Sequence, residues 1–287
     1  MNEFWNNAIE LICEALRSYL IKQSDKLFEI LNVSATEVAD SVGRSPKDWS
    51  SSVFGIVSSL SENVILPIGG MVLTFVVCYE IISLVLEKNN MHDFDSASLY
   101  IILLKMSLGV YVLSHSFEIC MALFEVSQYV VNKSGALLQT NGALEVSSQF
   151  IENVEMIDNP IELLSMLISL QIMKMIMNFI MIGMSLVLSG RFIEIFCYCS
   201  VAPIPFATFL NREWGQMGFN YARGIMALAF QAFFMMICFA VYYGLIANIN
   251  MVTDITQSLF KALGYSILLL FALFKTNSWS KSIFNAH

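Results

Sequence analysis

The sequence predicts an all-α protein of the polytopic membrane class, and three observations lead to this prediction. Hydrophobic residues make up 57% of the 287 residues and charged residues only 13%, about half the roughly 25% charge of soluble domains. The mean hydropathy is +0.67. Several apolar runs reach the ~20 residues that an α-helix needs to cross a bilayer. A soluble domain of this length could not bury so much apolar surface, whereas lipid can contact it directly.

Residues 1–52 are predicted to form an amphipathic helix and a linker. Apolar residues recur at spacings of three, four or seven over residues 2–32, as on one face of a helix. Such a helix lies in the lipid headgroup layer or packs on a neighbouring subunit, and the sequence leaves both open. Residues 32–52 are polar and contain Gly43 and Pro46, so they are predicted to be a linker.

Residues 53–124 are predicted to hold the first two membrane spans. These spans are residues 64–86 and residues 99–124, with a short polar loop between them. Proline and glycine near the start of the first span loosen the helix and allow another backbone to approach closely. The residues of this helix-breaking joint are Pro67, Gly69 and Gly70.

Residues 125–162 are predicted to be an acidic external loop, because they include several Asp and Glu residues and one basic residue, Lys133. Residues 163–287 are predicted to form a C-terminal membrane bundle. Its apolar spans are residues 163–188, 224–249 and 258–274.

Between the third and fourth spans, residues 192–210 are apolar but cannot form one regular helix. Pro203 and Pro205 each remove a backbone donor and restrict the residue before them. The segment is therefore predicted to be a broken span or a re-entrant hairpin, covered by protein or water. The favoured arrangement is five spans plus this Pro-broken or re-entrant segment, and six full spans remain open.

The five-span arrangement gathers most Lys and Arg residues near span ends on one face. Because such residues favour the cytoplasm, the N-terminus is predicted to lie outside and the C-terminus inside. The residues on the cytoplasmic face are Lys88, Arg191, Arg212, Arg223, Lys275 and Lys281.

Ionisable residues lie within the predicted spans, where an unpaired charge is costly. Glu80 lies six residues before the end of the first span and Lys105 six residues after the start of the second. We expect these two to form an ion pair, which either stabilises the contact between the helices or takes part in a proton or ion relay. Lys174 and Glu118 are predicted to face a pore or another subunit, and Lys174 has no evident partner in its own chain. Snorkelling of Lys174 to the surface is the alternative.

Catalytic motifs are missing from the sequence. It contains no phosphate-binding loop, no His-Glu-x-x-His and no Gly-x-Ser-x-Gly, and its three histidines and six cysteines are scattered. The prediction is a protein that is not an enzyme, with no cofactor and no metal. No internal repeat of the kind found in many secondary transporters is visible.

Several motifs occur together in a fixed order along the chain. They are Trp49, Pro67-Ile68-Gly69, an Arg191-led segment ending in Ala202-Pro203-Ile204-Pro205, and Trp214-Gly215 followed by Gly218 and Arg223. In combination they resemble the TrbL-like polytopic inner-membrane subunits of type IV secretion and conjugation systems, the family of the sixth VirB protein. The short form from Gram-positive conjugative elements is similar in length and in these motifs.

This resemblance implies a channel component that helps move DNA or protein across the bacterial cytoplasmic membrane. Its expected partners are the lipid bilayer, further copies of itself, other inner-membrane secretion subunits and secretion ATPases, with transient contact to the transferred DNA or protein. Arg191, Arg212 and Arg223 would form a cytoplasmic basic rim, and Pro203 and Pro205 a packing joint. Two alternatives stay open: a secondary transporter, and a structural membrane scaffold without a pore.

Overall fold

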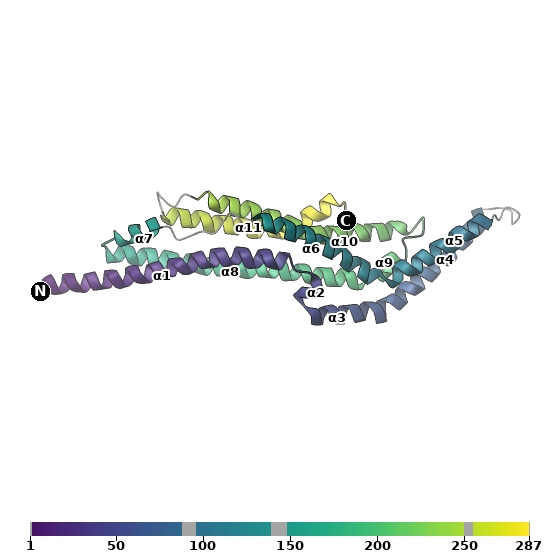
Figure 1. The fold of residues 1–287 in the computed structure, drawn as a ribbon, viewed down its shortest axis with the longest axis horizontal. Helices are drawn as coiled ribbons and strands as arrows, with labels where there is room; N and C mark the ends of the chain where they lie inside the picture. Colours follow the sequence, from purple (N-terminus) through teal and green to yellow (C-terminus); the bar gives the residue numbers. More distant parts are fainter. Residues whose placement is uncertain (1, 88–95, 139–147, 250–254, 287) are drawn as a thin grey trace. The chain divides into compact units, whose positions relative to one another are not determined.

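The computed structural model describes residues 2–87, 96–138, 148–249 and 255–286, which form helices and, within these ranges, no strand (Figure 1). The predicted all-α membrane class is confirmed: four described helical stretches are long and apolar enough to cross a bilayer, and a bent pair could supply a fifth. The helices are α1 (Asn2–Val42), α2 (Pro46–Trp49), α3 (Ser51–Leu60), the π-helical η1 (Ser61–Ile65), α4 (Leu66–Glu87), α5 (Ser96–Ser114), α6 (Ser116–Leu138), α7 (Ser148–Glu155), α8 (Pro160–Ser200), α9 (Pro203–Phe206), α10 (Gly215–Ala247) and α11 (Ile255–Ile283).

The chain folds as two compact units, each built from three separate stretches of sequence. As a result, the long helices α8, α10 and α11 each contribute residues to both units. The first unit comprises Met1–Val42, Lys133–Leu188 and Met235–Lys275, and the second comprises Gly43–Asn132, Ser189–Phe234 and Thr276–His287.

The core of the first unit follows helical periodicity along α8. Its buried residues recur at intervals of three, four or seven positions, so they form one face of the helix. Three methionines belong to this face, where their flexible side chains fill the packing space. The buried residues are Leu163, Leu170, Met173, Met177, Ile180, Met184 and Leu188.

Helix α1 is longer than predicted and packs within the first unit. It continues to Val42, because the helix-breaking Gly43 and Pro46 come only after that residue. Its Arg17 Nη2 lies 2.7 Å from Asp158 Oδ1, beyond the C-terminal end of α7. Residues 33–42, predicted as linker, are therefore helical.

The predicted second span is broken at His115, where the two halves bend by 65°. The His115 amide donates to the Tyr111 carbonyl at 3.2 Å, and the His115 ring Nδ1 lies 3.1 Å from the same oxygen. Competition of this kind weakens a helix locally. Helix α6 then runs on to Leu138, into the predicted external loop, of which residues 139–147 lie outside the described residues. Lys88 lies outside them as well.

Helix α8 removes the boundary predicted between the third span and the Pro-broken segment. It is continuous over 41 residues, which corresponds to about 60 Å, roughly twice the hydrocarbon thickness of a bilayer. No proline interrupts it before Pro203, and Gly190 alone does not end a helix. The irregular backbone is thus confined to residues 201–214.

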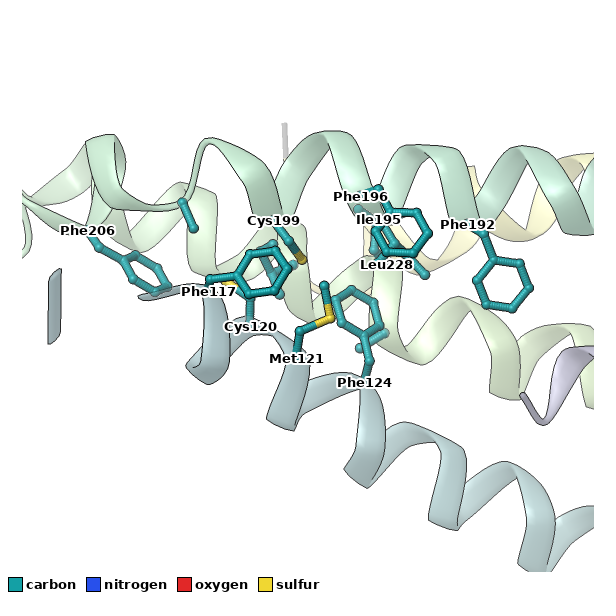
Figure 2. Close-up of a cluster of buried hydrophobic side chains, with 13 residues drawn as sticks. Phe117, Cys120, Met121, Phe124, Phe192, Ile195, Phe196, Cys199, Phe206 and Leu228 are labelled. Carbon is teal, nitrogen blue, oxygen red and sulfur yellow. The ribbon is translucent and has the colours of Figure 1, made fainter. Parts of the chain in front are cut away.

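The core of the second unit gathers aromatic and sulfur-containing side chains from α6, α8, α9 and α10 (Figure 2). Trp49 of α2 stacks on Phe192 of α8 with ring centroids 5.1 Å apart, which attaches the short α2 to this core. The labelled residues are Phe117, Cys120, Met121, Phe124, Phe192, Ile195, Phe196, Cys199, Phe206 and Leu228.

Candidate functional site

Residues 201–214, named here the proline turn, connect α8 to α10. Pro203 begins the single-turn helix α9, at the position where a missing amide leaves no hydrogen bond unmade. The Ala207 amide donates to the Pro203 carbonyl at 3.1 Å, and Thr208 Oγ1 donates to the Pro205 carbonyl at 2.8 Å. The two prolines therefore shape a compact turn whose backbone polar groups are largely satisfied locally.

The proline turn lies in the groove between α4 and α5, at a point where α4 carries no side chain. A Cβ atom added at Gly69 would lie 2.9 Å from Pro203 Cβ and 2.8 Å from Leu113 Cδ1 of α5. At distances this short, any other residue at position 69 would force a neighbouring group to shift. Gly69 therefore allows the backbone of α9 to approach α4 directly.

A second glycine admits the turn further along the same groove. A Cβ at Gly109 of α5 would lie 2.8 Å from Leu210 Cδ1 and 3.1 Å from Leu73 Cδ1 of α4. Between the two glycine levels, Ala207 is completely buried with Leu73 and Leu113. Small residues on the helices and the turn thus allow the turn to approach both helices closely, as is common in membrane bundles.

A polar cluster closes the groove at its far end. Lys105 Nζ of α5 donates to Glu80 Oε1 of α4 at 2.7 Å, and Asn211 Nδ2 of the turn donates to Glu80 Oε2 at 3.1 Å. Both carboxylate oxygens are therefore used, one by a cation and one by an amide. The similar depth of Glu80 and Lys105 in their spans predicted that these two residues pair. Asn211 was not predicted, because no nearby sequence feature shows that it lies close to α4.

Asn211 also organises the backbone that leads into α10. Its Oδ1 accepts hydrogen bonds from the amides of Glu213 at 2.8 Å and Trp214 at 2.9 Å, as asparagine does at a helix start. Asn211 is 4% exposed, so a side chain without these partners would be costly there. One residue thereby couples the charge pair to the end of the proline turn.

Trp214 fastens the end of the turn to α4. Its ring stacks on Phe75, with centroids 5.2 Å apart, and on Tyr79, with centroids 5.4 Å apart. Tyr79 Oη donates to Glu213 Oε2 at 2.7 Å. Because Phe75 and Tyr79 are four residues apart on one helix face, they form a continuous aromatic surface for the indole ring.

The other members of the predicted joint have separate surroundings. Pro67 is the second residue of α4, which follows η1, and the extra residue of a π-turn relieves the clash that a proline makes with the preceding turn. Gly70 would have nothing within 4 Å of an added Cβ. Pro205 meets α10 instead, since a Cβ at Gly218 would lie 2.8 Å from the Pro205 carbonyl oxygen.

Lys174 belongs to the first unit and Glu118 to the second. Lys174 Nζ of α8 donates to Gln23 Oε1 of α1 at 3.0 Å. The expectation that Lys174 lacks a partner in its own chain is therefore wrong, because the α1 helix supplies one. Glu118 is exposed on α6 and lines a cavity of the second unit.

The three arginines predicted as a rim differ in exposure. Arg212 is exposed and Arg223 is half-buried, but Arg191 is only 6% exposed. The Arg191 guanidinium carbon lies 5.7 Å from the centroid of the Phe192 ring. Its burial does not fit an exposed rim, because the apolar core around Phe192 extends to this turn of α8.

A comparison with known protein families places these features in context. Residues 31–203 match the family described as TrbL/VirB6 plasmid conjugal transfer like protein. The chain belongs to this TrbL/VirB6-like family. The match ends at Pro203, the first residue of α9, and includes both helices of the groove. No curated protein and no solved structure matches the chain.

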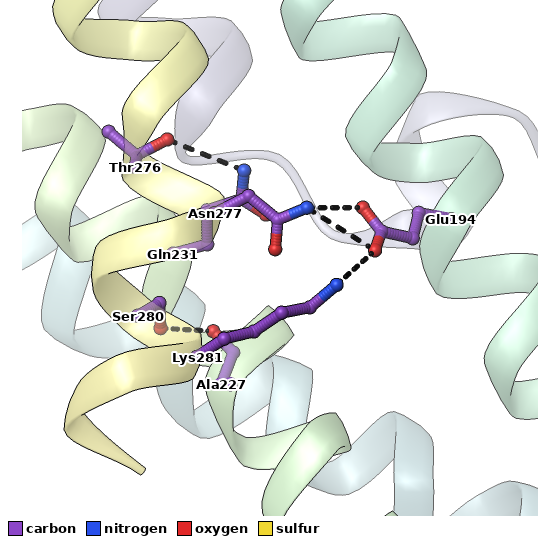
Figure 3. A network of polar contacts seen from close by, with 7 residues as sticks. All are labelled: Glu194, Ala227, Gln231, Thr276, Asn277, Ser280 and Lys281. Carbon is purple, nitrogen blue, oxygen red and sulfur yellow. Dashed lines mark hydrogen bonds and ion pairs between the residues drawn. The ribbon is translucent and has the colours of Figure 1, made fainter. Parts of the chain in front are cut away.

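One polar network joins Glu194, which lies inside the matched residues 31–203, to residues of α11 that lie outside them (Figure 3). Asn277 Nδ2 donates to Glu194 Oε2 of α8 at 3.2 Å, and Lys281 Nζ donates to Glu194 Oε1 at 3.2 Å. Ser280 Oγ donates to the Ala227 carbonyl of α10 at 2.5 Å. The sequence alone did not predict this network, although Asn277 and Lys281 are four residues apart on one face of α11.

Proposed function

We propose that this TrbL/VirB6-like membrane protein is a non-enzymatic channel component of a type IV secretion or conjugation machine in the bacterial cytoplasmic membrane. It would help move DNA or protein across that membrane. The observation that supports this most strongly is the family match over residues 31–203, which contains the α4–α5 groove and ends at the proline turn.

The proposed mechanical role of the proline turn is that of a fixed joint. Contacts at Gly69, Gly109 and Glu80 tie the α8–α10 connection to a helical hairpin. A turn that packs at three positions resists displacement better than an exposed loop, because a loop with few packed contacts is more mobile. The joint would keep α8 and α10 in register with α4 and α5 while substrate passes.

The exposed apolar surface supports assembly into a homo-oligomer. Only 17% of the most apolar window in Ser51–Leu86 is buried, against 56% in Gly215–Ala247. The first stretch therefore offers its surface to lipid or to a neighbouring copy, whereas the second is central to the fold. In our proposal, neighbouring copies cover part of Ser51–Leu86 and form a ring.

The proposed orientation places the N-terminus outside and the C-terminus in the cytoplasm. Arg212 and Arg223 would then form the basic rim that contacts secretion ATPases, other inner-membrane subunits or the transferred substrate. Arg191 is left out of this rim because it is buried.

The test is complementation of a strain from which the gene has been deleted. The wild-type gene should restore transfer, and an Arg212→Glu/Arg223→Glu variant should reach the membrane in equal amount but lower the transfer frequency. Lys22→Glu/Lys26→Glu is the matched control, since it reverses two exposed charges on α1. Transfer that does not depend on the gene would contradict the proposed function. Normal transfer by the double variant would contradict only the rim.

A further inference from the structure

A cavity of about 540 Å³ lies between the α2–α3 corner and one face of α6 in the second unit. Its wall is apolar at Phe54, Phe117 and Met121. Phe54 and Phe117 meet edge to face with centroids 5.6 Å apart, so this wall is packed rather than loose. The volume falls in the range of about 300–1,000 Å³ typical of binding pockets.

The rim of the same cavity is acidic. Glu118, Glu125 and Asp48 contribute three negative charges, against one positive charge from Lys47. Asp48 is held in place by Ser45 Oγ, which donates to it at 2.6 Å. Glu118 and Glu125 are exposed, and neither forms an ion pair within the described residues. The rim therefore carries a formal charge of −2 that favours a cationic occupant.

The spacing of Glu118 and Glu125 determines the geometry of that occupant. Glu118 and Glu125 are seven residues apart on α6 and lie on the same helix face, about 10 Å apart along its axis. Met121, between them, belongs to the apolar wall. Because carboxylates are costly in lipid hydrocarbon, this face must meet water or protein, and its apolar wall favours protein.

We propose that this cavity binds an amphipathic helix of a different protein, one that carries two Lys or Arg residues seven positions apart with apolar side chains between them. Such a helix would match α6 in both charge spacing and apolar contact. A second copy of this chain does not supply the pattern, because no two of its 15 Lys and Arg residues are seven positions apart. The proposal concerns the chemistry of the surface and does not depend on the transfer function.

The test uses the full chain in nanodiscs of zwitterionic phosphatidylcholine and a fluorescein-labelled amphipathic helical peptide with two lysines seven positions apart. Fluorescence anisotropy should show saturable binding that empty nanodiscs lack. A peptide of identical composition with its lysines five positions apart should bind at least about 10-fold more weakly, because its charges leave the common face. Equal affinity for both peptides, or equal binding to empty nanodiscs, would overturn the proposal.

Variants of the chain locate the binding surface. Glu118→Gln/Glu125→Gln should raise the Kd at least about 10-fold, whereas Glu152→Gln/Glu155→Gln, which removes the same charge from exposed residues of α7, should leave it unchanged. A charge-reversed chain, Glu118→Lys/Glu125→Lys, should bind the peptide in which both lysines are replaced by glutamate. An unchanged Kd for the first variant, or failure of the reversed pair to bind, would place the site elsewhere.

Discussion

Substituting alanine at two adjacent glycines tests how closely the proline turn packs on α4. A Cβ at Gly69 would meet Pro203 Cβ at 2.9 Å and the Pro203 carbonyl carbon at 3.0 Å, whereas one at Gly70 would meet nothing within 4 Å. The proline ring and backbone cannot rotate away, so Gly69→Ala forces α9 to shift. Overpacking of this kind costs about 1–3 kcal/mol. Both substitutions gain the same helix propensity, about 1 kcal/mol, so that gain cancels in the comparison.

The measurement is equilibrium unfolding of the purified chain in mixed detergent micelles, followed by helical circular dichroism. Gly70→Ala should be as stable as the wild type or slightly more stable. Gly69→Ala should lie about 1–3 kcal/mol below Gly70→Ala. Equal stability of the two variants would refute the reasoning, because it would mean that α9 does not press on Gly69.

Three further predictions follow from other contacts. In a double-mutant cycle, Glu80→Gln and Lys105→Met should show a coupling of about 1–2 kcal/mol in the same unfolding assay, since the pair lies within spans; additive effects would contradict pairing. Lys174→Met leaves the buried amide of Gln23 without its partner, so it should destabilise the fold by about 1 kcal/mol and speed tryptic cleavage of α1; unchanged cleavage would show that this bond does not hold α1. Ser280→Ala should cost about 1 kcal/mol, because a buried hydroxyl bonds a carbonyl of α10, whereas Ser282→Ala, at an exposed position of the same helix, should be neutral.

The sequence predicted the membrane class and the charge pair because both follow from local quantities. Apolar runs report the spans directly, and the equal depth of Glu80 and Lys105 needed only the assumption that consecutive spans are antiparallel. Pro203 and Pro205 likewise predicted irregular backbone at their own positions. They could not show that the turn packs in the groove between α4 and α5.

The errors arose where context outweighs local signals. The bend at His115 lies within a run that is apolar overall, so hydropathy does not report it. The continuity of α8 through Gly190 removes the boundary predicted between residues 163–188 and residues 192–210. Burial of Arg191 and the Gln23 partner of Lys174 both come from helices distant in sequence, which composition and periodicity do not report.

The most direct test of the account is disulfide cross-linking of the proline turn to α4 in native membranes. In a chain whose natural cysteines are replaced by serine or alanine, Leu73→Cys and Ala207→Cys should cross-link rapidly under mild oxidation, because the two residues pack together in the groove. Ile82→Cys with Ala207→Cys should not, since Ile82 is 56% exposed elsewhere on α4. Rapid cross-linking of the first pair alone is the result we predict. No cross-link for that pair, or equal rates for both, would mean that the turn does not occupy the groove in the membrane.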